Sequence, residues 1–350
     1  MMGNSRGEAQ VVSQSGSQVG AQMNEWGVIG HDAVVRRLQA AIAGGQTAQA
    51  NLIVGPASVG KTTLARAYTR ALLGVDERTR RLLDAGRHPD VLELRPEDDK
   101  NSIGIDPTRA WLRQMTLAPV EGAYRVGLIG HEQAPTEEAQ NAILKTLEQP
   151  PSSVVIVITA LSVDELLSTI VSRCQVIALR PAPYESVRTV LRARGASDEA
   201  SDRIARLARG RVGWALGALS DESVLVERDA RVAELEGLLR AGATERFAFA
   251  DKLSKKKDKS ASADESPVRV VLGEWLLFWR DVAASFGSVS AQSLRNSDRR
   301  ALLESVRERI TLVEVRRILE LHTHTMQNIE RNANVRLSLD VLLMNLPRLR

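Results

Sequence analysis

Residues 55–62, with the sequence GPASVGKT, constrain the fold of this chain more than any other segment. Two glycines separated by four residues and followed by Lys and Thr form the phosphate-loop pattern of nucleotide-binding proteins. The pattern follows an apolar run at residues 51–54, which predicts a buried strand, and precedes a helical pattern at residues 62–73. Strand, glycine-rich turn and helix in this order are the setting in which such a loop binds phosphate. The sequence therefore predicts an α/β domain that binds a nucleotide.

Each residue type in this loop suits a phosphate ligand. Glycine at positions 55 and 60 lets the backbone amides curve around phosphate oxygens without a Cβ in the way. The positive end of the following helix also favours an anion. We expect Lys61 to reach the outer phosphates and the Thr62 hydroxyl to ligate Mg²⁺. The predicted contacts to ATP or ADP with Mg²⁺ are Gly55, Pro56, Ala57, Ser58, Val59, Gly60, Lys61, Thr62 and Thr63.

Beyond the loop, apolar runs of strand length alternate with segments of helical periodicity. Strands are predicted at residues 125–129, 154–159 and 175–179, and helices at residues 31–42, 136–147 and 163–170. Alternating strands and helices favour a parallel sheet that is covered by helices on both faces.

The composition changes along the chain and suggests four parts. Residues 1–24 are rich in Gly, Ser and Gln and predict a disordered tail, because they have little apolar surface to bury. The phosphate-loop domain is predicted at residues 25–182, a small helical unit at 183–222, and longer amphipathic helices at 223–350. A charged stretch at residues 252–267, with Lys255, Lys256 and Lys257, is interpreted as a solvated loop or a basic helix end.

Composition narrows the possible functions. Lys and Arg exceed Asp and Glu by only 4, which permits contact with nucleic acid but does not argue for it. Aromatic residues make up 3% of the chain, so a stacking surface for single-stranded nucleic acid is not predicted. Cys174 is the one cysteine, which excludes an intramolecular disulfide and a cysteine zinc cluster, so no zinc is expected. No leader-like or membrane-spanning pattern is found, and a cytoplasmic protein is expected.

The acidic half of an ATPase site is harder to find than the phosphate loop. Such sites need a carboxylate at the tip of a neighbouring strand for Mg²⁺ and a second group for the attacking water. The strand at residues 125–129 is followed by Gly130-His131-Glu132-Gln133, with no acid in the expected register. A slip of one residue would turn Glu132 in another direction. We therefore expect weak or absent ATP hydrolysis by this chain alone.

Two longer segments carry a family resemblance. Residues 141–151 (NAILKTLEQPP) and 169–175 (TIVSRCQ) closely resemble segments of bacterial clamp-loader subunits of the AAA+ class. Supporting matches are His88-Pro89-Asp90, residues 102–106 (SIGID) and residues 332–337 (NANVRL). The matches occur in the expected order over nearly the whole chain.

The resemblance implies a fold and a function. The fold is an AAA+ module, a helical lid and an all-α collar that assembles with gamma/tau and delta types of subunit into a hetero-pentamer. Arg173 corresponds to an arginine finger that points into the ATP site of a neighbouring subunit. Thr159 corresponds to a polar sensor of the γ-phosphate, although it could equally cap a turn. The degraded acidic motif implies the delta-prime type of DNA polymerase III, a stator that helps load the sliding clamp onto primed DNA.

Further positions agree or disagree with the family pattern. In residues 210–216 (GRVGWAL), Trp214 is interpreted as replacing the arginine of the second sensor. The four-cysteine zinc module of many relatives is absent from residues 75–90. Trp26, Val28 and Ile29 would line an adenine pocket or pack in the core, and Cys174 is interpreted as a small buried hydrophobe.

Three other functions remain open on the sequence. An active gamma/tau-like motor would keep the fold but would need a working acid near Glu132. A nucleotide kinase would leave the helical third of the chain unexplained. A scaffold that binds no nucleotide would make the intact Lys61 and Thr62 accidental.

Overall fold

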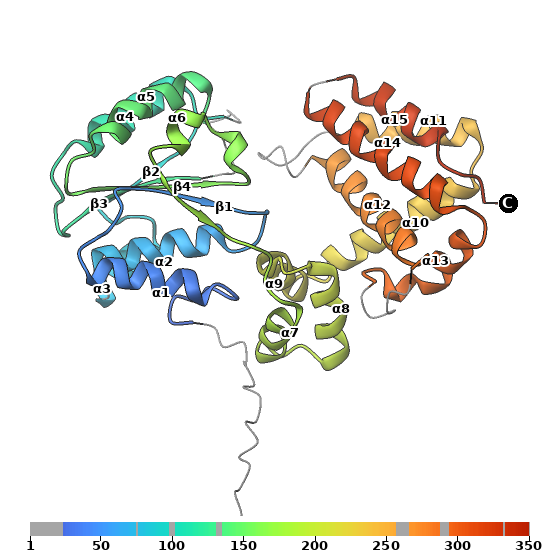
Figure 1. Ribbon diagram of the computed structural model, residues 1–350, viewed down its shortest axis with the longest axis horizontal. Helices are drawn as coiled ribbons and strands as arrows, with labels where there is room; N and C mark the ends of the chain where they lie inside the picture. Colours follow the sequence, from blue (N-terminus) through green and yellow to red (C-terminus); the bar gives the residue numbers. More distant parts are fainter. Residues whose placement is uncertain are drawn as a thin grey trace, which may run out of the picture.

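A five-stranded parallel sheet organises the first half of the chain (Figure 1). The computed structural model describes residues 24–74, 76–97, 102–130, 135–256, 266–287, 294–331 and 333–349. The strand order is β2-β3-β4-β1-β5, so β1 lies between two strands that follow it in the chain, β4 on one side and β5 on the other. The strands are β1 (Ala50–Val54), β2 (Val91–Leu94), β3 (Arg125–Ile129), β4 (Val154–Ala160) and β5 (Gln175–Ala178).

Helices cover both faces of this sheet, as expected from the alternating pattern (Figure 1). One face carries α1 (Asp32–Ala43), α2 (Lys61–Leu73) and α3 (Glu77–Asp84), and the other carries α4 (Ile105–Met115), α5 (Glu137–Glu148) and α6 (Ser168–Val171). Successive residues of β4 enter different cores because side chains alternate along a strand. Ile156 and Ile158 pack with Trp111 and Ile143, whereas Val155 and Val157 belong to the core on the α1 and α2 side.

The expected elements of this half are confirmed, with three additions. The strand β2 and the helices α3 and α4 were not predicted from the sequence. The predicted helix at 163–170 is instead two short pieces, the 3₁₀ turn η1 (Val163–Glu165) and α6, because Leu166 is extended and interrupts it. Gly127 of β3 lets α4 approach the sheet, since a Cβ there would lie 2.3 Å from the Trp111 ring.

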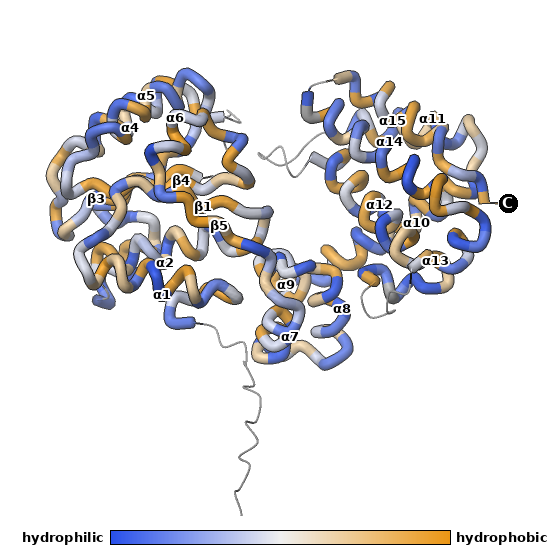
Figure 2. The backbone as a smooth tube through the Cα atoms, viewed as in Figure 1, coloured by the Kyte–Doolittle hydropathy of each residue, from blue (hydrophilic) through white to orange (hydrophobic). Residues whose placement is uncertain are grey.

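The remainder of the described chain is helical. A small core joins α7 (Tyr184–Ala193), α8 (Asp198–Ala208) and α9 (Val212–Ser220). A larger core, with Trp275, Phe278 and Trp279 at its centre, joins the helices that follow. They are α10 (Ser223–Arg240), α11 (Ala243–Ser254), α12 (Pro267–Ala284), α13 (Arg300–Arg307), α14 (Leu312–Glu330) and α15 (Val335–Met344), with the 3₁₀ turn η4 (Ser297–Arg299) before α13. Figure 2 shows apolar residues concentrated where these helices face one another.

Several sequence predictions fall on residues outside this description. The predicted disordered tail lies outside the described residues except for Asn24, and so do residues 131–134 and 257–265. Lys255 lies directly after α11 and forms an ion pair with Asp251 at 2.7 Å. In the described part of the chain, no helix combines the length and apolar character needed to cross a membrane.

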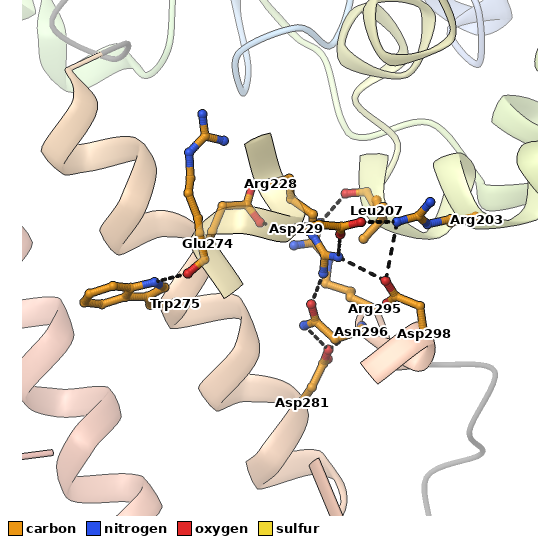
Figure 3. A network of polar contacts seen from close by, with 11 residues as sticks. Arg203, Leu207, Arg228, Asp229, Glu274, Trp275, Asp281, Arg295, Asn296 and Asp298 are labelled. Carbon is orange, nitrogen blue, oxygen red and sulfur yellow. Dashed lines mark hydrogen bonds and ion pairs between the residues drawn. The ribbon is translucent and has the colours of Figure 1, made fainter. Parts of the chain in front are cut away.

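A buried polar network joins α8 to the larger helical core (Figure 3). Arg228 of α10 is 2% exposed, and its guanidinium contacts Asp229 at 2.9 Å, Asp298 at 3.2 Å and Asn296. From α8, Arg203 bridges Asp229 at 2.6 Å and Asp298 at 3.6 Å. Burial opposes ionisation of Asp229, but hydrogen bonds from Arg228 and Arg203 hold its pKa below the usual value. The network therefore fixes the three-helix unit to the helices that follow it.

His322 of α14 makes the stability of the larger helical core depend on pH. Its side chain is fully buried in a T-shaped arrangement with the Trp275 ring, and burial lowers its pKa from 6.5 to about 4. Below about pH 6.5 the unfolded chain binds this proton and the folded chain does not, so the free energy of unfolding falls by up to roughly 3 kcal/mol as the pH drops to about 4.

His322→Leu should remove most of this loss in denaturant titrations followed by tryptophan fluorescence at the two pH values. His324→Leu, at an exposed position of the same helix, is the matched control and should leave the loss unchanged. An equal loss in wild type and His322→Leu would contradict this assignment.

Candidate nucleotide site and surface arginine

The phosphate loop leaves the carboxyl end of β1, the strand between β4 and β5 in the sheet. Every residue of β1 is buried, which fixes the start of the loop. Gly55 has φ of 153°, and a Cβ there would lie 2.5 Å from the carbonyl oxygen of Leu179, so only glycine fits. Gly60 has φ of 108° and directly precedes α2. Ligands of parallel α/β sheets bind at this edge, outside the carboxyl ends of the strands.

Lys61 points back into the loop. Its side chain is 2% exposed, and Nζ donates to the carbonyl oxygens of Gly55 at 2.7 Å and Pro56 at 2.9 Å. Thr62 and Thr63, the next residues of α2, are exposed. The end of the loop thus carries an ammonium group at the N-terminus of α2, with two exposed threonines in the first turn of the helix. This donor set fits the phosphates of a nucleotide, with Thr62 as the residue that would hold Mg²⁺.

The first turn of α9 rests on the phosphate loop. The Gly213 N–H donates to the carbonyl oxygen of Ser58 at 2.8 Å, and a Cβ on Gly213 would lie 3.2 Å from that oxygen. Trp214 is instead stacked with Arg211, whose guanidinium carbon lies 5.5 Å from the centre of the indole ring. The α9 residue that faces the loop is therefore Gly213 rather than Trp214. Trp214, interpreted from the sequence as the second-sensor position, is one residue further along α9 and therefore lies on a different face of the helix.

Thr159 lies near the loop in the adjacent strand, where it pairs in register with Ile53 of β1. Its side chain is buried, and Oγ1 donates to the carbonyl oxygen of Ile129 in β3 at 3.4 Å. This hydrogen bond links β4 to the neighbouring strand β3. His131 and Glu132, the residues interpreted as a degraded acidic motif, lie outside the described residues.

Arg173 lies away from the chain's own phosphate loop, since it comes two residues before Gln175 of β5, which pairs with Asn51 near the start of β1, whereas the loop follows the end of β1. Its guanidinium pairs with Glu148 of α5 at 2.7 Å and donates to the carbonyl oxygen of Thr169 at 2.9 Å. The side chain is 35% exposed, so it is accessible from the surface. The adjacent Cys174 packs against the sheet core, and burial raises the pKa of its thiol to about 11. This residue therefore suits a packing role better than thiol chemistry.

Other motif residues hold the fold together. Asp90 is fully buried, and its carboxylate accepts hydrogen bonds from the backbone N–H groups of Val120, Glu121 and Gly122. Asn334 caps α15 by accepting from the N–H of Leu337. Both residues belong to segments that carry the family resemblance. In this chain, both side chains hold backbone segments in place.

The residues interpreted as lining an adenine pocket or packing in the core make packing contacts in this structure. Val28 and Ile29 are buried, and the Trp26 ring lies 6.2 Å from that of Tyr68 between ring centres. They lie directly before α1, beside the helix that follows the phosphate loop.

Comparison with known proteins identifies relatives of the first half of the chain. Residues 30–183 match the family model described as DNA polymerase III, delta subunit. The DNA polymerase III subunit delta' of Escherichia coli is 33% identical over 143 residues, which is 41% of this chain and 43% of that protein. The subunit tau of Salmonella typhimurium is 30% identical over 171 residues, which is 46% of this chain and 26% of that protein. The match thus spans less than half the length of each of these two relatives.

A solved structure covers more of the chain at lower similarity. The crystal structure of a DNA polymerase III gamma subunit-related protein from Thermotoga maritima covers 90% of this chain and 99% of its own, with 19% identity and a TM-score of 0.45. A likeness at this level does not bear on function.

Proposed function

We propose, from the premise that residues 30–183 belong to the DNA polymerase III clamp-loader family, that this chain is a delta-prime-like subunit of a bacterial clamp loader. In this role it would act as a stator that helps load the sliding clamp onto primed DNA and donates Arg173 to the ATP site of a neighbouring subunit. The observation that carries the proposal is the contrast between the lid residue at the chain's own phosphate loop and the arginine at its surface. The lid residue on the chain's own phosphate loop is Gly213, which supplies no cation, whereas Arg173 is presented at the surface.

We assign parts of this role to parts of the chain. Residues 25–182 would form the AAA+ module, residues 183–222 the lid, and residues 223–350 a collar that assembles with gamma/tau and delta types of subunit. Contact with primer-template DNA would be made through the assembly. The polar network around Arg228 supports a fixed connection between the proposed lid and collar, as a stator requires.

The phosphate loop supports nucleotide binding by this chain. When bound, Mg²⁺ would neutralise charge on the phosphates, with Thr62 as its protein ligand. Lys61 would exchange its contacts with the loop carbonyl oxygens for the outer phosphates. The chain's own hydrolysis would be weak or absent, so the nucleotide would serve chiefly as a structural ligand.

Lys61→Ala should weaken ATP binding to the isolated chain by roughly 10- to 150-fold, because a charge-assisted hydrogen bond contributes about 1.5–3 kcal/mol. Binding of a fluorescent ATP analogue measures the dissociation constant directly. Lys145→Ala, at an exposed position on α5, is the matched control and should bind as wild type does. Equal affinity in wild type and Lys61→Ala would mean that this loop is not the nucleotide site.

A gamma/tau-like motor is the second candidate, because the phosphate loop is intact and tau subunits are among the relatives. ATP turnover by the isolated chain distinguishes the two roles. A stator enters a complex with gamma/tau and delta types of subunit and hydrolyses little ATP alone. A motor shows turnover by itself, and Glu132→Gln would abolish that turnover.

A further inference from the structure

The segment that leads to Arg173, which contains α6, is attached to α5. Gln140 of α5 is buried, and its side-chain oxygen accepts from the backbone N–H of Leu167, directly before α6. Its amide nitrogen donates to the carbonyl oxygen of Pro135 at 3.0 Å. Ile170 of α6 is 1% exposed and packs into the sheet core. The backbone leading to Arg173 is therefore fixed, and the freedom that remains lies in the arginine side chain.

The guanidinium itself is held by three contacts. Two come from the residues just before it, because Nη1 donates to the carbonyl oxygen of Thr169 at 2.9 Å and to Ser172 Oγ at 3.4 Å. The third comes from another helix, since Nη2 donates to Glu148 Oε1 at 2.7 Å. Glu148 is the last residue of α5, so the pair joins the two sequence segments that carry the family resemblance.

This ion pair is too exposed to matter much for stability. The side chains of Arg173 and Glu148 are 35% and 51% exposed, and pairs in such positions contribute little to folding. The pair acts instead on the orientation of the Arg173 guanidinium. An arginine side chain has several free torsions, and a partner that fixes them beforehand reduces the entropy lost when the guanidinium engages a phosphate.

We propose that Glu148 is a positioning residue, which orients the Arg173 guanidinium on the surface of this subunit for the ATP site of its neighbour. The inference rests on the proposed function of Arg173. Glu148 does not contact the nucleotide itself in this account. It acts on the reaction through Arg173 alone, and its effect must vanish when Arg173 is absent.

Steady-state ATP turnover of the reconstituted clamp loader, with clamp and primed DNA, tests this role. Glu148→Ala should lower kcat at the served site by roughly 10- to 100-fold, the loss typical of a catalytic group misplaced by about 1 Å. The KM for ATP should stay within about twofold, because the interaction is made in the transition state. Glu148→Gln keeps an oxygen acceptor and should restore most of kcat. The double variant with Arg173→Ala should be no slower than Arg173→Ala alone.

Glu121→Ala is the matched control, because Glu121 forms a similar exposed pair with Arg78 at 2.8 Å on the same module. It should leave turnover unchanged, and size-exclusion chromatography should show equal assembly for all variants. Wild-type or faster turnover in Glu148→Ala, together with collapse in Arg173→Ala, overturns the positioning role and leaves the proposed function intact. Wild-type turnover in Arg173→Ala overturns both.

Discussion

Arg228→Ala should lower the free energy of unfolding by about 3–5 kcal/mol, the range for removing one partner from a buried ion-pair network. The side chain is 2% exposed and lies among Asp229, Asp298 and Asn296 (Figure 3). Its removal leaves the buried Asn296 and the partly buried Asp229 and Asp298 without this partner. Arg203 can still pair with Asp229 and Asp298 but is itself 39% exposed. The loss should therefore be large even though the fold persists.

Denaturant titration followed by tryptophan fluorescence measures this loss, since Trp275 lies one residue from Glu274, another neighbour of Arg228. Arg231→Ala is the matched control, because Arg231 of the same helix pairs at i,i+4 with Glu227, which is 64% exposed, and the substitution should cost less than about 1 kcal/mol. Arg228→Lys keeps the charge but lacks the planar guanidinium, so its loss in the free energy of unfolding should lie between those of Arg228→Ala and Arg231→Ala. Equal stability of the Arg228→Ala and Arg231→Ala variants would contradict the importance of this network.

The strands with strong apolar character were predictable from the sequence because they are buried in the sheet. All seven residues of β4 are buried, and such a run has few alternatives to a central strand. The strand β2 was missed because it has four residues and includes the exposed Glu93, so it lacks an apolar run. Its position depends on pairing with β3, which is a long-range contact.

The candidate site was predictable in part for a similar reason. The phosphate loop is local, so its residues and its relation to β1 and α2 follow from spacing. The contact of Gly213 with Ser58 joins residues far apart in the chain, and no pattern within either segment predicts it. The pairing of Glu148 with Arg173 was likewise hidden, although both residues lie in segments that had been singled out.

Arg173→Ala should reduce turnover at the neighbouring ATP site by roughly a thousandfold or more, the effect of arginine fingers in related phosphoryl-transfer systems. The guanidinium would stabilise charge that develops on the transferred phosphoryl group, and no other residue of this chain is proposed for that role. Arg173→Lys should recover little, because an ammonium group lacks the planar fork. Arg78→Ala, which removes an exposed arginine on the same module, is the control and should leave turnover unchanged.

The most direct test compares ATP turnover of the complete loader, with clamp and primed DNA, for wild type, Arg173→Ala and Lys61→Ala. A stator that donates a finger predicts collapse with Arg173→Ala and a change of less than about threefold with Lys61→Ala, because the chain's own loop would not supply the hydrolysis. Collapse with Lys61→Ala, or rapid hydrolysis by the isolated chain, would contradict this account and identify the chain as a motor.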